Sequence, residues 1–319
     1  MKIKRILYIF LIILLIILSS CKAKTPLEAI ERGRLQDLKE FHQKGYKLNK
    51  KINKTDSFLI YSIRKGYDDI SIWLIKNKIN DINEPDSLDN TPIIIAYLNK
   101  RYKVFNELLK NKAKLNKFNF NGRNLISIVT ENGDYKNFKK LIETYKVHIK
   151  FKIEEGLYEG YTIIQFAVLG GNLEILKYIK TKMPKFWRKN KNKSNLMIIA
   201  SEKGNIEMMT FLDSIGIKMN SQNRDGWTTL MSAAKSGKLD AVMLILGYGA
   251  NVNTKTNFNW TALMSAVMSK NLEIVKVLVE SGADITQENN NGKNSFEIAI
   301  DENNTEIANY LKIKIENTK

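Results

Sequence analysis

Apolar residues recur at helical spacing along most of the chain. Two stretches about a hundred residues apart show the same spacing: Leu173, Leu176 and Ile179, then Leu272, Val275 and Leu278. Steps of three and four residues place apolar side chains on one face of an α-helix. None of the four prolines interrupts such a run. The pattern therefore predicts a chain of short amphipathic helices.

The helical pattern repeats with a period close to 33 residues. Thr228 and Thr261 open two closely similar segments 33 residues apart, and another 33 residues lead to Asn294. Working backwards, weaker copies open at Ser194, Thr162, Asn124, Thr91, Ser57 and Thr25. A fixed period of this length is typical of a repeat array, in which each unit packs only on its neighbours. Nine units then cover residues 25–319.

The opening positions have the chemistry of helix starts. All nine are Ser, Thr or Asn, whose side chains accept a hydrogen bond from a free backbone N–H at an N-cap. Pro26 and Pro92 follow directly, at the first helical position, where a missing N–H costs nothing. Glycines fall at or within one residue of a common offset, where we expect the first helix of a unit to end: Gly33, Gly66, Gly133, Gly171, Gly204 and Gly237. Each unit is therefore predicted to be a helix-turn-helix.

Residues 224–286 resemble the ankyrin consensus, in which G-x-T-P-L-H-x-A opens the first helix and G-A-D-V-N follows the second. The resemblance implies an all-α ankyrin-repeat solenoid of about nine helix-turn-helix units with short finger loops. The consensus His is absent here, so we expect apolar packing at the positions that replace it: Ile94, Met197, Met231 and Met264. Two irregularities stand out, an insertion near residues 145–158 and a basic loop over residues 184–193.

The first 21 residues form a separate pattern. Three basic residues precede an unbroken apolar run of 13 residues, Ile6 to Leu18, which is too short to span a bilayer. The run ends in Ser19-Ser20-Cys21, which resembles the lipobox of bacterial lipoproteins. The resemblance implies that residues 1–20 are a signal peptide, cut between Ser20 and Cys21, and that residues 21–24 are a lipidated N-terminus anchored through acylated Cys21. The alternative is an uncleaved N-terminal helix.

Charge is distributed unevenly. The chain carries 51 Lys and Arg against 33 acidic residues. Residues 225–319 hold nine Lys and eleven acids, whereas residues 22–224 hold 39 basic and 22 acidic residues. A net charge of +17 on that longer segment indicates anionic partners and says nothing of fold.

Candidate chemistry is sparse, so we expect no enzyme, no cofactor and no metal site. The two histidines, His42 and His148, fall in different repeats, and Cys21 is the only cysteine. No Cys or His pair has metal-ligand spacing, and no glycine-rich phosphate loop follows a strand.

Aromatic residues give the candidate binding positions. Three aromatic residues each precede a predicted N-cap: Tyr161, Trp227 and Trp260. The resemblance to ankyrin repeats implies that partners bind at this part of the finger. The alternative is that each ring packs on the neighbouring finger. Trp187 and Arg188, in the basic loop, are candidates for an anionic surface; the alternative is a solvated loop with its rings packed on the stack.

These observations predict a non-catalytic protein-interaction scaffold, a monomer, held by its lipid anchor on the extracytoplasmic side of the cell membrane or outer membrane. Its expected partner is an acidic protein, and no nucleic acid is expected. The alternative is an envelope surface binder whose basic N-terminal repeats hold anionic polymer or lipid headgroups. Steep release by salt would favour that alternative.

Overall fold

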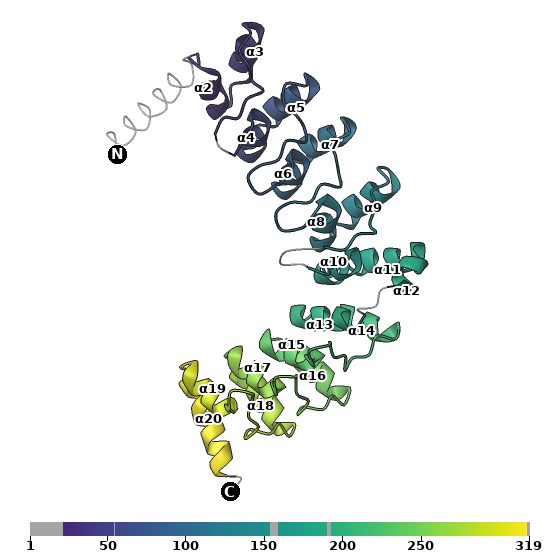
Figure 1. Ribbon diagram of the computed structural model, residues 1–319, viewed down its shortest axis with the longest axis vertical. Helices are drawn as coiled ribbons and strands as arrows, with labels where there is room; N and C mark the ends of the chain where they lie inside the picture. The colour runs from purple at the N-terminus through teal and green to yellow at the C-terminus, as the bar shows by residue number, and fades with distance from the viewer. Residues whose placement is uncertain (1–21, 54, 154–158, 190–192, 318–319) are drawn as a thin grey trace, which may run out of the picture. The chain divides into compact units, whose positions relative to one another are not determined.

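The described part of the chain in the computed structural model is helical; it comprises residues 22–53, 55–153, 159–189 and 193–317 (Figure 1). Its only β-type pairings are the isolated bridges Lys51–Ser57 and Gln222–Thr228. The first helix of each pair is α2 (Pro26–Glu31), α4 (Phe58–Lys65), α6 (Pro92–Leu98), α8 (Leu125–Glu131), α10 (Ile163–Leu169), α13 (Lys193–Lys203), α15 (Thr229–Lys235), α17 (Ala262–Met268) and α19 (Ser295–Asp301). The second is α3 (Leu35–Gln43), α5 (Asp68–Lys76), α7 (Tyr102–Lys110), α9 (Tyr135–Glu143), α11 (Leu173–Lys182), α14 (Ile206–Ser214), α16 (Leu239–Gly247), α18 (Leu272–Glu280) and α20 (Thr305–Glu316). The predicted all-helical repeat architecture is confirmed.

The chain divides into two compact units, residues 1–125 with 155–157 and residues 126–154 with 158–319. In the first unit α4 packs on α6, and α5 packs on α7. In the second unit α13, α15, α17 and α19 pack in succession, and α16, α18 and α20 do the same. Within each unit, first helices therefore form one layer and second helices another, as repeat packing requires.

Most of the predicted N-caps form as expected. The side chain accepts a hydrogen bond from the backbone of the first turn at Thr25, Ser57, Thr162, Thr228, Thr261 and Asn294. Thr91 has extended backbone at its N-cap, but its side chain makes no cap hydrogen bond. The six glycines predicted to end first helices all have positive φ.

The sixth pair departs from the prediction. Ser194 is not an N-cap, because α13 begins at Lys193 and has 11 residues, whereas α15 has seven. The helix thus extends upstream past the position at which the other first helices start. The predicted basic loop over residues 184–193 is also wrong in part, because Pro184–Lys189 forms the extra helix α12. Pro184 opens this helix at a position where its missing N–H is tolerated.

The core is continuous along the first helices of each unit. The residues that replace the consensus His are at most 1% exposed: Ile94, Met197, Met231 and Met264. The prediction of apolar packing at these positions is confirmed. Helix ends also approach closely, since a Cβ on Gly170 would lie 2.4 Å from the carbonyl oxygen of Thr130. Only glycine fits there.

In the part of the chain that the structure describes, every helix is too short or too polar to cross a bilayer.

Candidate protein-binding surface

Finger loops connect each second helix to the first helix of the next pair, and five of them share one turn. The residue five positions before the N-cap accepts hydrogen bonds from the backbone N–H groups two and four positions later. In the finger before α6, Asp86 Oδ1 accepts from Leu88 N (2.9 Å) and Asn90 N (2.8 Å). The same two bonds form at Asn119, Asn223, Thr256 and Asn289. A short polar side chain therefore folds each of these fingers locally.

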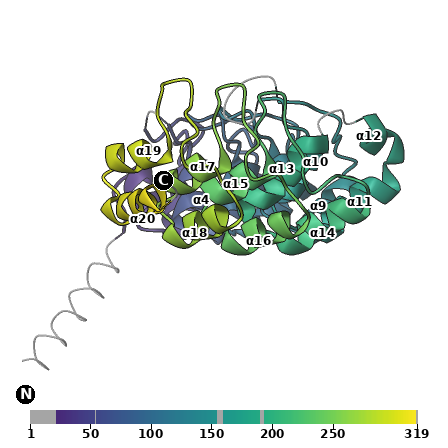
Figure 2. The same cartoon turned by 90° about the horizontal axis from the view of Figure 1, so that it is seen from below.

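The chain reverses two residues before the N-cap. The residue there has positive φ in all five fingers: Asp89, Gly122, Gly226, Asn259 and Gly292. Asp and Asn are the non-glycine residues that best tolerate this left-handed region. The reversal makes the residues three and four positions before the cap the most projecting part of the finger. In the second unit the fingers before α15, α17 and α19 project on the same side of the helix layers (Figure 2).

Large apolar side chains occupy several of these tips. Leu88 is 56% exposed, Phe120 is 74% exposed and Phe258 is 65% exposed. Neighbouring tips are joined through their backbones, because Phe120 N donates to Leu88 O (3.0 Å) in the first unit and Asn290 N donates to Phe258 O (3.1 Å) in the second. Because hydrogen bonds already order the backbone beneath these side chains, a partner that bound them would not have to order that backbone.

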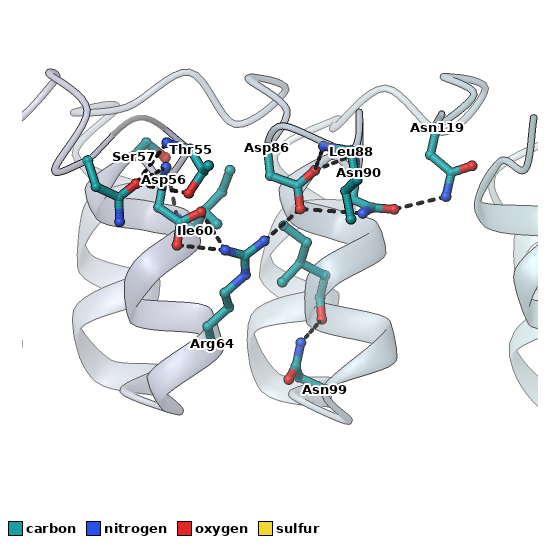
Figure 3. Close-up of polar contacts among 12 residues, drawn as sticks. Thr55, Asp56, Ser57, Ile60, Arg64, Asp86, Leu88, Asn90, Asn99 and Asn119 are labelled. Carbon is teal, nitrogen blue, oxygen red and sulfur yellow. Dashed lines mark hydrogen bonds and ion pairs between the residues drawn. The ribbon is translucent and has the colours of Figure 1, made fainter. Parts of the chain in front are cut away.

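A network of charged and amide side chains fixes the fingers of the first unit (Figure 3). Arg64, on α4, donates to Asp56 (2.5 Å and 2.7 Å) in its own finger and to Asp86 (2.6 Å) in the next. Both carboxylates are nearly buried, with side chains 6% and 2% exposed. Asn119 in the following finger then donates to Asn90 (2.9 Å). Three successive fingers are thus linked beneath the tips of Leu88 and Phe120.

The sequence model of the family described as "Ankyrin repeats (3 copies)" matches residues 27–119, 125–223, 196–289 and 230–319. The chain belongs to the ankyrin-repeat family. A search of curated proteins gives no match. Ankyrin repeats in general are protein-interaction modules, so protein partners are the general expectation for this chain, and catalysis is not.

The aromatic residues just before the N-caps of this ankyrin array do not form its tips. Trp227 is half-buried with Lys235 Nζ 5.5 Å from its ring, and Trp260 Nε1 donates to Ser265 Oγ (2.8 Å) on α17. Because the turn has already reversed, these side chains return along the first helix. The interpretation of the residue directly before the N-cap as the tip of the finger is therefore wrong: the exposed tip residues lie two to three residues earlier in the sequence.

A recurrent pair confirms this direction. The residue before the cap contacts the residue eight positions later in three repeats: Asp56 with Arg64, Trp227 with Lys235, and Lys293 with Asp301. The hydrogen bond and charge of Asp301 raise the pKa of Lys293 above its ordinary value. Two of the pairs are ion pairs with the charges in opposite order and the third is a cation–π contact, so different side chains use the same geometry.

The predicted row of aromatics is interrupted. Trp227 and Trp260 belong to successive repeats, whereas Tyr161, half-buried against Phe166 (ring centroids 5.6 Å apart), lies two repeats before Trp227. The equivalent position between them falls at Lys193, the first residue of α13. Partner binding by these three aromatics remains a prediction.

The remaining candidates are dispersed. Trp187 is only 8% exposed, whereas Arg188, its neighbour in α12, is exposed. The charge of Arg188 is therefore open to solvent and the ring of Trp187 packs inward, and partner binding by either residue stays a prediction. Ser20 and Cys21 lie outside the described residues. His42 packs edge-on against Trp73, with ring centroids 5.7 Å apart. The described residues hold no group of three His, Cys, Asp or Glu placed to bind a metal.

Sequence reasoning missed Leu88, Phe120 and Phe258. The available signal was the Asp, Asn or Thr five residues before each cap, which folds the turn and so defines which residues project. Counting from that residue instead of from the cap would have identified all three tips.

Proposed function

We propose that this ankyrin-repeat protein is a non-catalytic scaffold that binds a protein partner through the finger tips of its first unit. The supporting observation is the combination at Phe120, a ring 74% exposed whose backbone N–H is hydrogen-bonded to the neighbouring finger. Such an exposed and fixed ring has no role in the core, and it suits a pocket on a partner.

The surroundings of these tips define the partner's chemistry. Phe118, in the same finger as Phe120, is 45% exposed, and Lys114 and Lys117 are exposed beside it. The first 203 residues after Cys21 carry the net charge of +17. We therefore expect an apolar pocket with an acidic rim, because rim charges of opposite sign speed association and set orientation.

Binding is tested with a variant that removes the tips and with a matched control. Leu88→Ser with Phe120→Ser deletes the two apolar tips, while Tyr102→Ser deletes another large exposed side chain (45%), on α7 and away from the tips. In a pull-down from crosslinked intact envelopes, the double variant is expected to lose the partner and Tyr102→Ser to keep it. Equal capture by all three proteins would refute the tip surface.

The second part of the proposal is that acylated Cys21 anchors the scaffold to the envelope, on the extracytoplasmic side. Its support is the lipobox-like sequence, together with the tethering of the residues that follow. Ala23 N donates to Asp37 Oδ2 (2.7 Å), and Lys22 forms a salt bridge with Glu40. An acyl chain on Cys21 would then hold the first helix pair at the bilayer without a flexible linker.

Intact mass and membrane fractionation of the protein from its own host test this anchor, beside Cys21→Ser. The proposal predicts loss of residues 1–20, added acyl mass and sedimentation with membranes for the wild type only. A retained leader on unmodified protein would refute it and return cytoplasmic partners to consideration.

The alternative is direct electrostatic binding of anionic polymer or lipid headgroups by the basic repeats. It is favoured only by the +17 charge of residues 22–224. At physiological salt, the attraction between exposed charges falls off over a screening length of about 8–10 Å, so electrostatic binding should weaken as salt is added. Release of envelope material between low and high salt, unaffected by loss of Leu88 and Phe120, would support this alternative over the finger-tip complex.

A further inference from the structure

Loops that follow the second helices in the second unit are normally covered by the next repeat. Asn253 Nδ2 donates to Gly282 O (2.9 Å), and Asn253 Oδ1 accepts from Asp284 N (2.8 Å). Asn220 Nδ2 likewise donates to Tyr248 O (3.4 Å). Each of these loops thus satisfies polar groups of the loop beside it.

Among the described residues, no side chain of the next repeat forms such a hydrogen bond with the loop after α9. In the covering loops after α16 and α18, the residue ten positions after the start of the helix is a glycine with positive φ, Gly249 (φ +74°) or Gly282 (φ +89°). Ten residues after the start of α11 stands Met183, with φ −133°, followed by Pro184. The left-handed turn is lost, and the chain continues into α12 (Figure 1).

A cleft of about 470 Å³ lies where the covering loop is missing. Its lining comes from residues 147–150 after α9 and from residues 182–185 between α11 and α12. Apolar lining is provided by Val147, Ile149, Met183 and Pro184. This volume lies within the range of about 300–1,000 Å³ that is usual for ligand-binding clefts.

One wall of the cleft has the residue pattern of a β-strand. Both ends of this segment are already bonded, because Val147 N donates to Leu141 O (3.1 Å), Ile153 N donates to Tyr161 O (2.9 Å) and Ile153 O accepts from Gly160 N (2.8 Å). Residues 147–153 alternate: His148, Lys150 and Lys152 are exposed, Val147 and Phe151 are half-buried, and Ile149 and Ile153 are buried. A period of two residues is that of an extended strand with one face on the core. Within the described residues the backbone groups of 148–150 make no hydrogen bond. An open edge of this kind is a template for a further strand.

The cleft is positively charged. Its ionisable lining residues are His148, Lys150, Lys182 and Lys185, and none forms a salt bridge within the described part of the chain. Lysines at an edge discourage pairing between two copies of the same strand, because like charges would oppose each other. They favour a strand with acidic side chains.

We propose that this cleft binds an extended acidic peptide segment of a partner protein, which adds as a short strand along residues 148–150 and takes the place of the covering loop. Backbone hydrogen bonds to residues 148–150 hold the peptide, and alternate acidic side chains face Lys150 and Lys182. The proposal rests on protein binding as the function of the array but is independent of the finger tips.

The test uses the full chain in detergent and a fluorescent nine-residue peptide of alternating Glu and Leu, measured by anisotropy. Lys150→Glu with Lys182→Glu is expected to weaken binding at least about tenfold, as loss and reversal of two ion pairs should. The matched control, Lys136→Glu with Lys139→Glu, changes exposed lysines on α9 outside the cleft lining and is expected to leave affinity unchanged. Met183→Trp, which fills the cleft without changing charge, is expected to weaken binding as well.

A second peptide, methylated on alternate backbone nitrogens, tests strand addition separately, since it keeps its charge and cannot pair. It is expected not to bind. Equal binding of both peptides, or equal effects of the cleft and control variants, would overturn the proposal. Binding of vesicles containing phosphatidylglycerol that depends on Lys150 and Lys182, without peptide binding, would overturn it in favour of a lipid surface. Leu88→Ser with Phe120→Ser is expected to bind the peptide normally, so failure of the finger-tip proposal is distinguishable.

Discussion

The fingers of the two units share a turn but are fixed by different chemistry. In the first unit, a guanidinium joins two nearly buried carboxylates from successive fingers, Asp56 and Asp86 (Figure 3). In the second unit, neutral amide groups link neighbouring fingers. Asn259 Nδ2 donates to Asn290 Oδ1 (2.9 Å) in the next finger. Charged bonds are stronger but leave a costly unpaired charge when one partner is lost. The first unit should therefore be more sensitive to single substitutions beneath its tips.

The largest effect is expected at Arg64. Arg64→Ala leaves Asp56 and Asp86 without their shared cation and should destabilise the first unit by about 2–3 kcal/mol. The loss is smaller than for a fully buried pair because the arginine side chain is 39% exposed. Urea-induced unfolding followed by circular dichroism measures the change.

Lys235→Ala is the matched control, because Lys235 occupies the equivalent position on α15, where it is exposed over Trp227. It should cost about 0.5–1 kcal/mol, the range for an exposed cation–π contact. Similar losses for the two variants would show that the first unit gains nothing particular from its ionic bridge.

The next effect is expected at Thr256, the neutral residue that folds the finger before α17. Thr256→Val keeps its shape but removes the acceptor for Phe258 N and Trp260 N, at a cost of about 1–2 kcal/mol. Thr256→Ser keeps the hydroxyl and should retain most of the stability. Hydrogen exchange at Phe258 and Trp260 should accelerate in the valine variant alone; unchanged exchange would contradict the shared turn.

Finger tips should contribute almost nothing to folding. Phe120→Ser removes a ring that is 74% exposed, so the free energy of unfolding should change by no more than about 0.5 kcal/mol. The same holds for Phe258→Ser in the second unit. A loss of several kcal/mol at either residue would mean that the ring packs in solution and is not available to a partner.

The smallest effect concerns Tyr310 on α20. Burial, with a further contribution from the charge of Glu280, raises the pKa of this phenol. The folded state therefore keeps a proton that the unfolded state releases, and this stabilising contribution, complete below about pH 10, is lost as pH rises through the raised pKa. Tyr310→Phe should flatten the loss of stability between pH 9 and 11, measured by urea titration. An unchanged slope would contradict the assignment.

The same variant should cost little at neutral pH. The Tyr310 hydroxyl is buried and has no hydrogen-bond partner among the described residues, so its removal leaves no group there unsatisfied. A large loss at pH 7 would indicate a hydroxyl partner in solution.

Much of the fold could be predicted from the sequence because the repeat signals are local. An N-cap threonine such as Thr228 and a glycine such as Gly237 act within one helix, and their spacing carried the prediction across nine units. The start of α13 and the existence of α12 could not be predicted in this way. Both features depend on how far a helix extends beyond the residue at which it usually begins. Contacts with residues that are distant in the sequence determine that length.

The site was harder to predict for a geometric reason. Trp227 and Trp260 were chosen by residue type, but the positive φ two residues before the cap turns them onto the first helices. Leu88 and Phe120 project because Asp86 and Asn119 fold the turn by accepting backbone hydrogen bonds. The sequence does not show these hydrogen bonds directly.

The most direct test of the proposed scaffold is site-specific photocrosslinking in intact cells, with a benzophenone side chain placed at residue 120 and, as the control, at residue 102 on α7. We expect a discrete protein adduct from position 120 that disappears with Leu88→Ser, and no such adduct from position 102. Protein adducts of equal yield from both positions would contradict binding through the finger tips. Labelling of lipid from position 120 without any protein adduct would contradict it as well.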